Sequence, residues 1–112
     1  MLHIMNLNAE PFNAIKNKTK TMEFRLYDEK RQLINLNDTI KFINLSDTNQ
    51  SISVKVIGLL HYNSFEDLFN NIPYNNTNEN KSVAEKTSGM RRFYSKESEQ
   101  KYGVLAINIE VL

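Results

Sequence analysis

Five stretches of the chain alternate apolar and polar side chains with the period of two that is typical of β-strands, and this pattern limits the possible folds most. Segments with helical spacing or polar turn residues lie between them, so strands and helices interleave along only 112 residues. Only the region 54–60 is apolar at nearly every position, as a parallel strand covered on both faces would be. We therefore expect a single α+β domain over residues 1–112: a mixed sheet of about five to six strands that curls into a small β-barrel with flanking helices. The predicted strands cover residues 2–7, 21–27, 39–44, 51–62 and 104–111.

Four short helices are predicted between the strands, and Ser64 and Ser95 are each in position to cap one of them. Gly103 would end the last helix, whereas Gly89 would interrupt or weaken the one before it. Gly58 predicts a bulge or bend in the long strand, because a glycine inside a strand often accompanies one. The predicted helices cover residues 8–17, 64–69, 82–94 and 95–103, with an asparagine-rich loop over 70–81.

The composition excludes several kinds of site. The chain has no cysteine, which rules out a disulfide framework, a thiolate zinc site and a cysteine nucleophile. Its two histidines, His3 and His61, lie far apart, and there is no glycine-rich phosphate loop, so no metal and no cofactor are expected. No apolar run approaches the ~18 residues of a membrane helix, and no signal-like segment opens the chain. We expect a soluble, cytoplasmic protein.

Charge is unevenly distributed although the formal net charge is only +1. Residues 16–31 and 81–101 each carry three more basic than acidic side chains, and the rest of the chain is acidic. If the two basic segments share a face, that face is suited to a polyanion. The alternative is that these lysines and arginines belong to ordinary solvated surfaces.

The strand over 21–27 places Glu23 and Arg25 on one side, with Lys20 at its entrance. These three could line a concave pocket, where arginine would fork to a phosphate or base edge, glutamate would accept from an exocyclic amine and lysine would supply charge. The alternative is a plain salt bridge on an exposed sheet face, worth under ~1 kcal/mol.

A second candidate region interleaves basic and aromatic residues, as single-strand RNA binders do. Arg91 and Arg92 directly precede Phe93 and Tyr94. Both rings could instead dock the helix onto the barrel, and for Phe93 the pattern favours this second interpretation.

The segment from Lys20 to Leu26, KTMEFRL, follows a predicted helix that contains Pro11-Phe12 and Ile15-Lys16. It resembles the motif G-x-K-x-x-E-x-R of the ASCH domain family, a branch of the PUA-like β-barrel superfamily. The similarity extends over almost the whole chain and is to the compact bacterial form. It implies a PUA-like pseudobarrel with a cleft that binds RNA or a modified pyrimidine nucleoside. Lys20, Glu23 and Arg25 would form the floor of that cleft, with Arg91, Arg92 and Tyr94 at its rim.

The resemblance also implies a hydrolytic alternative. Some small members are similar to N4-acetylcytidine amidohydrolases, which use a lysine, a threonine and a glutamate, and others resemble single-strand ribonucleases. Lys20 matches the lysine, and Glu79 is the candidate for the glutamate. Glu23 stands where the nucleophilic threonine would be, so it would act as a general base toward water, unless Thr21 supplies the hydroxyl. A non-enzymatic interaction module is the third interpretation.

Two residues depart from the family pattern at expected glycines. Asn37 replaces one and tolerates the left-handed conformation. Lys18 replaces the other, where that conformation would cost about 1 kcal/mol, so we expect the helix end to be re-formed around Asn17.

Overall fold

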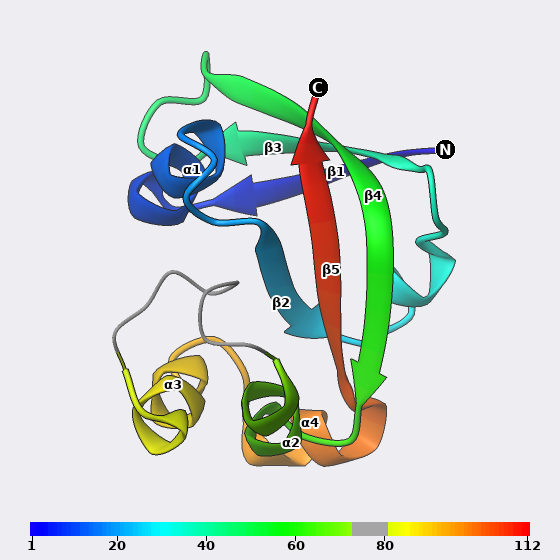
Figure 1. The fold of residues 1–112 in the computed structure, drawn as a ribbon, viewed down its shortest axis with the longest axis vertical. Helices are drawn as coiled ribbons and strands as arrows, with labels where there is room; N and C mark the ends of the chain where they lie inside the picture. Colours follow the sequence, from blue (N-terminus) through cyan, green and yellow to red (C-terminus); the bar gives the residue numbers. More distant parts are fainter. Residues whose placement is uncertain (73–80) are drawn as a thin grey trace.

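The structure, a computed structural model, describes residues 1–72 and 81–112 (Figure 1). Its five strands form one curled, mixed sheet in the order β1-β3-β4-β5-β2, which confirms the predicted α+β class and barrel-like architecture. The β1–β3 pair is parallel, and every other pair is antiparallel. The strands are β1 (Leu2–Leu7), β2 (Met22–Leu26), β3 (Thr39–Asn44), β4 (Ser51–Tyr62) and β5 (Val104–Val111).

The helices gather at two ends of the sheet (Figure 1). Helix α1 (Ala9–Lys16) connects β1 to β2, while α2 (Phe65–Asn71), α3 (Val83–Met90) and α4 (Lys96–Tyr102) lie together beyond the end of β4. A single 3-10 turn, η1 (Arg31–Leu33), follows β2. None of the helices in the described ranges has the length and apolar character needed to cross a membrane.

The predicted helix over 82–94 is wrong in extent, because α3 ends at Met90. The Met90 carbonyl accepts from the backbone N–H groups of both Phe93 and Tyr94, so the chain tightens into a turn there. Sequence periodicity could not predict where α3 ends. The turn after α3 is held by a contact between Arg91 and Glu99 of α4, which lies in another helix.

Two hydrophobic clusters form the core, one on each face of β5. Leu105 and Ile107 face the larger cluster, with Phe12 and Ile15 of α1. Val104 and Ala106 face the smaller cluster, with the aromatic rings of α2. The strand covered on both faces is therefore β5, whereas the apolar run at 54–60 lies in an antiparallel strand that leaves Ile57 and Leu60 exposed. The run is therefore not covered on both faces, although its pattern resembles that of a doubly covered parallel strand.

Glycine and left-handed residues mark the irregular points of the backbone. The bulge predicted at Gly58 is confirmed by a register shift between Val56 and Gly58, where an added Cβ would lie 3.0 Å from Cβ of Asn108. Asn37 has φ 72°, as predicted for a turn.

Lys18 also adopts a left-handed conformation, with φ 64°, so the helix end is not re-formed around Asn17 as expected. The N–H of Lys18 donates to the Ile15 carbonyl (3.0 Å), and that of Thr19 donates to the Ala14 carbonyl (2.9 Å). These are the two bonds of a Schellman motif, which satisfy carbonyls that the end of α1 would otherwise leave unpaired. This reversal directs the chain back toward β2 and places Lys20 at its start.

Candidate functional site

Glu23 occupies the inward face of β2. It lies opposite Ile107 of β5, and directly opposed residues share a sheet face, so its side chain points to the same side as the larger hydrophobic cluster. Met22, Phe24 and Leu26 pack on the other side, as the alternation predicts. The Glu23 residue is only 5 % exposed. A carboxylate at such a position requires partners, because an isolated buried charge is very unfavourable.

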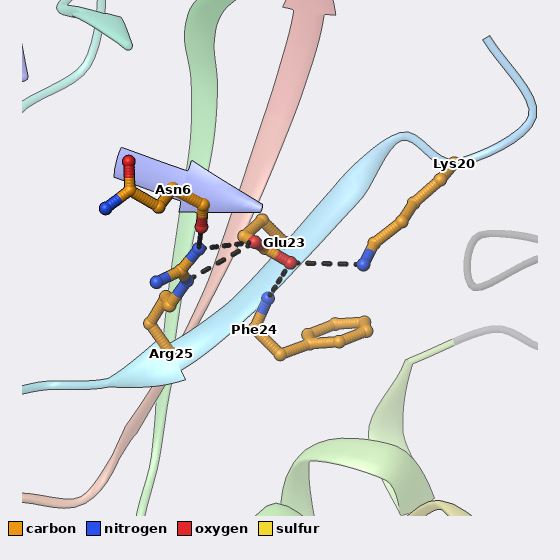
Figure 2. Close-up of polar contacts among 5 residues, drawn as sticks. All are labelled: Asn6, Lys20, Glu23, Phe24 and Arg25. Carbon is orange, nitrogen blue, oxygen red and sulfur yellow. Dashed lines mark hydrogen bonds and ion pairs between the residues drawn. The ribbon is translucent and has the colours of Figure 1, made fainter. Parts of the chain in front are cut away.

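Lys20 and Arg25 provide these partners from opposite sides of the carboxylate (Figure 2). One oxygen, Oε1, accepts from Lys20 Nζ (3.1 Å) and from the backbone N–H of Phe24 (3.3 Å). The other, Oε2, accepts from Nη2 (2.9 Å) and Nε (3.3 Å) of Arg25. We refer to Lys20, Glu23 and Arg25 as the Glu23 cluster. Since a carboxylate offers about four acceptor positions, four donors occupy Glu23 fully.

Arg25 also joins the two edge strands of the sheet. Its Nη2 donates to the backbone carbonyl of Asn6 in β1 (3.0 Å), whereas β1 and β2 are not hydrogen-bonded neighbours in the sheet (Figure 2). A side chain therefore links the edges that a closed barrel would join by its backbone. Asn6 was not identified from the sequence, because a backbone carbonyl leaves no signal in the residue pattern.

The electrostatics of the cluster follow from this geometry. Burial by itself raises the pKa of Glu23, but the charges of Lys20 and Arg25 and their hydrogen bonds outweigh it, so the pKa lies below its usual value. For Arg25, burial lowers the pKa, and the Glu23 carboxylate more than compensates, so the pKa is raised. The cluster contains two basic side chains and one acidic side chain, a formal surplus of one positive charge.

Tyr94, predicted to lie at the rim, interacts with Arg25 of this cluster. Its ring stacks on Phe65 with 5.7 Å between centroids. Burial raises the pKa of the Tyr94 hydroxyl, and the charge of Arg25 opposes that shift. Arg25 and Tyr94 therefore act on each other electrostatically across the boundary between β2 and the α3–α4 turn.

Arg91 and Arg92 lie in different surroundings. Nη2 of Arg91 donates to Oε2 of Glu99 (2.6 Å), whose Oε1 accepts from the buried backbone N–H of Phe65 (2.6 Å). We refer to Phe65, Arg91 and Glu99 as the Glu99 cluster, which ties together the turn after α3, the start of α2 and helix α4. Arg92 is exposed and lines a shallow hollow on α3. The ligand-binding role of both arginines stays a prediction.

The remaining predicted site residue, Glu79, lies outside the described residues, as does most of the predicted loop. Within the described ranges, no three histidine, aspartate or glutamate side chains gather closely enough to hold a metal ion. Nε2 of His3 donates to Oδ2 of Asp38 (2.8 Å), a bond that lowers the pKa of the Asp38 carboxyl to about 2, and this contact holds the start of β1 to the turn before β3.

Comparison with known proteins identifies close relatives of the whole chain. A family model described as the ASCH domain matches residues 5–112. The hypothetical protein PH0355 of the archaeal genus Pyrococcus is 38 % identical, with a TM-score of 0.89 and coverage of 100 % of both chains. Protein PF0455 from Pyrococcus furiosus is 39 % identical, with a TM-score of 0.79, over 100 % of this chain and 98 % of that one. Both of these relatives are archaeal, so the similarity to a bacterial form stays a prediction.

A more distant structure shares the fold alone. The ASCH domain from Lactobacillus crispatus JV V101 is 17 % identical, with a TM-score of 0.62, over 98 % of this chain and 79 % of that one. Among curated proteins, none matches the chain significantly.

Proposed function

The chain belongs to the ASCH domain family, and on that premise we propose that it binds RNA or a modified pyrimidine nucleoside at the Glu23 cluster. The observation that carries the proposal is the saturation of Glu23. Its two oxygens accept four hydrogen bonds from within the chain, and they hold two cationic side chains in place. The acid neutralises only one of these cations. The cluster is thus a preorganised site for an electron-rich ligand.

The donors that remain define the ligand chemistry. Lys20 uses one of its three N–H groups on Glu23, and Arg25 uses Nε and both N–H groups of Nη2. The bonds described therefore leave two donors on Lys20, while one of the two remaining donors of Arg25 bonds to the Tyr94 hydroxyl. Phosphate oxygens or the carbonyl oxygen of a pyrimidine suit these groups, and the hydroxyl of Tyr94 lies next to Arg25. Glu23 acts in this scheme as a positioning residue.

The same geometry favours binding over hydrolysis by Glu23. A general base needs an oxygen free to take a proton and a pKa near the working pH, whereas Glu23 has occupied oxygens and a lowered pKa. An amidohydrolase or ribonuclease activity would therefore depend on other groups, such as the predicted Glu79. An interaction module that binds no nucleotide is the remaining alternative.

The main test is a titration of a fluorescently labelled single-stranded RNA octamer at low and at moderate salt. Lys20→Gln and Arg25→Lys should each weaken binding by about tenfold or more, because each removes a charge-assisted or forked contact. Lys30→Gln is the matched control, since Lys30 is exposed and forms no ion pair with a described residue. An affinity that neither site variant changes, or that salt does not alter, would contradict the proposal.

A second assay separates binding from turnover. The protein is incubated with N4-acetylcytidine, and the products are followed by mass spectrometry. We expect the nucleoside to remain intact. Deacetylation by the wild-type protein that Lys20→Gln abolishes would replace the binding proposal by the hydrolytic one.

A further inference from the structure

Phe93 is exposed, contrary to the favoured interpretation that it docks the helix onto the barrel. With 60 % of its surface accessible, Phe93 is exposed, whereas the other five phenylalanines of the chain are buried or half-buried. Its neighbour Tyr94 turns the other way and stacks on the buried ring of Phe65. The large apolar ring of Phe93 is therefore presented to solvent, where it gains little from the hydrophobic effect.

The backbone that carries Phe93 is held on both sides. Before it, Arg91 is bound to Glu99, a residue that is 3 % exposed. After it, Tyr94 is fixed in the smaller hydrophobic cluster, and the N–H of Phe93 itself donates to the Met90 carbonyl (3.1 Å). A ring on such an anchored turn is preorganised for contact, because binding would order few additional backbone torsions.

A cationic side chain directly precedes this ring and shares a hollow with a second one. Arg92 precedes it and lines a hollow of about 450 Å³ together with Lys81, Glu85 and Gly89. Neither Arg92 nor Lys81 forms an ion pair with a described residue. The one acid in the lining, Glu85, is engaged with the backbone N–H and the hydroxyl of Ser82 in the capping box of α3. The lining of the hollow therefore carries two basic side chains and one acidic side chain.

We propose that Phe93, Arg92 and Lys81 form a second contact for single-stranded RNA, in which a base stacks on Phe93 and the two cations hold neighbouring phosphates. An exposed aromatic ring beside unpaired cations is the combination by which proteins bind single strands without reading their sequence. The centroid of Phe93 lies 6.4 Å from that of Tyr94, and the Tyr94 hydroxyl interacts with Arg25, so we expect one strand to reach both contacts. The inference rests on the proposed function, since the Glu23 cluster would bind the same strand.

The test compares a single-stranded octamer with a mononucleotide. Phe93→Ala should weaken octamer binding about 5- to 100-fold and leave mononucleotide binding unchanged, because one stacked base is lost. Phe93→Trp should retain the octamer affinity, whereas Phe93→Leu, which keeps an apolar side chain without a π face, should behave like Phe93→Ala. Arg92→Gln should reduce the slope of log affinity against log salt by about one.

The outcomes separate this inference from the proposed function. If Arg25→Lys weakens binding and Phe93→Ala does not, the second contact is overturned while the Glu23 cluster stands. If Phe93→Leu binds the octamer like the wild type, stacking is excluded. RNA affinity unaffected by Phe93→Ala, combined with self-association that this variant abolishes, would assign the ring to a protein interface. Failure of every variant to alter binding would overturn both proposals.

Discussion

Two buried glutamates organise this small domain, and they differ in how their charge is balanced. Glu99 accepts from one arginine and one backbone N–H, so the Glu99 cluster has no net charge. Glu23 accepts from an arginine, a lysine and a backbone N–H, so the Glu23 cluster retains one positive charge. The first cluster connects helices, whereas the second lies at the start of an edge strand.

This difference in net charge suggests separate roles: we expect Glu99 to contribute to stability alone and Glu23 to contribute to ligand binding as well. A neutral, fully paired cluster leaves little electrostatic attraction for a ligand. A cluster with more cations than acids carries repulsion between like charges, which an anionic or electron-rich ligand would relieve. The following predictions test whether this contrast is real.

Glu23→Ala should give the largest effect, a loss of about 3–5 kcal/mol in the free energy of unfolding. The substitution leaves Lys20 and Arg25 as neighbouring, poorly solvated cations without their shared acid. Urea denaturation of the variant measures the loss. Glu23→Gln, which keeps oxygen and amide groups in the same space, should lose less. Equal stability of wild type and Glu23→Ala would mean that the two cations are well solvated without the acid.

Glu99→Ala should cost less, about 1–3 kcal/mol, because its main consequence is a buried N–H of Phe65 without an acceptor. Arg91 is more exposed than the cations around Glu23 and can turn to water. Denaturation is again the measurement. Glu99→Gln should leave mononucleotide affinity unchanged, since the mononucleotide would contact only the Glu23 cluster, and a tenfold loss in that variant would break the distinction between the two clusters.

The pH dependence of stability should report on Glu23. Its pKa is lowered in the folded protein, so its contribution is complete above the ordinary value near 4.5 and is lost as the pH falls toward the folded value. The difference in free energy of unfolding between wild type and Glu23→Gln should therefore be constant near neutral pH and shrink below about pH 4.5. The value of this difference at neutral pH is the largest that it should reach at any pH. A difference that grows on acidification would show that Glu23 is protonated in the native state.

Sequence reasoning located the strands well, because regular alternation ends at clear turn residues. The bounds of β3, β4 and β5 agree with the prediction. The end of α3 was missed because the turn after it is fixed by Arg91 and Glu99, which pair across eight positions in two elements. Local periodicity contains no information on such a contact.

The site could be predicted only as a set of residues. Residues two apart on a strand share a face, so the pattern placed Glu23 beside Arg25 and added Lys20. It could not show that the acid is saturated by four donors, nor that a main-chain carbonyl of β1 is one of the acceptors of Arg25. Both facts come from how strands distant in the sequence are brought together.

The smallest effect is expected at Lys18, which directs the chain into the Glu23 cluster. Lys18→Gly should raise the free energy of unfolding by up to ~1 kcal/mol, because φ 64° is strained for a residue with a Cβ, although the freer unfolded chain offsets part of the gain. Lys18→Ala removes the same charge and keeps the strain, so it is the control, and denaturation is the measurement. Equal stability of the two variants would contradict the argument. Gly103, at the end of the helix that carries Glu99, differs because an added Cβ would also lie 2.7 Å from Nε2 of His61. Glycine is therefore required beside the Glu99 cluster for both space and conformation, whereas beside the Glu23 cluster conformation alone favours it.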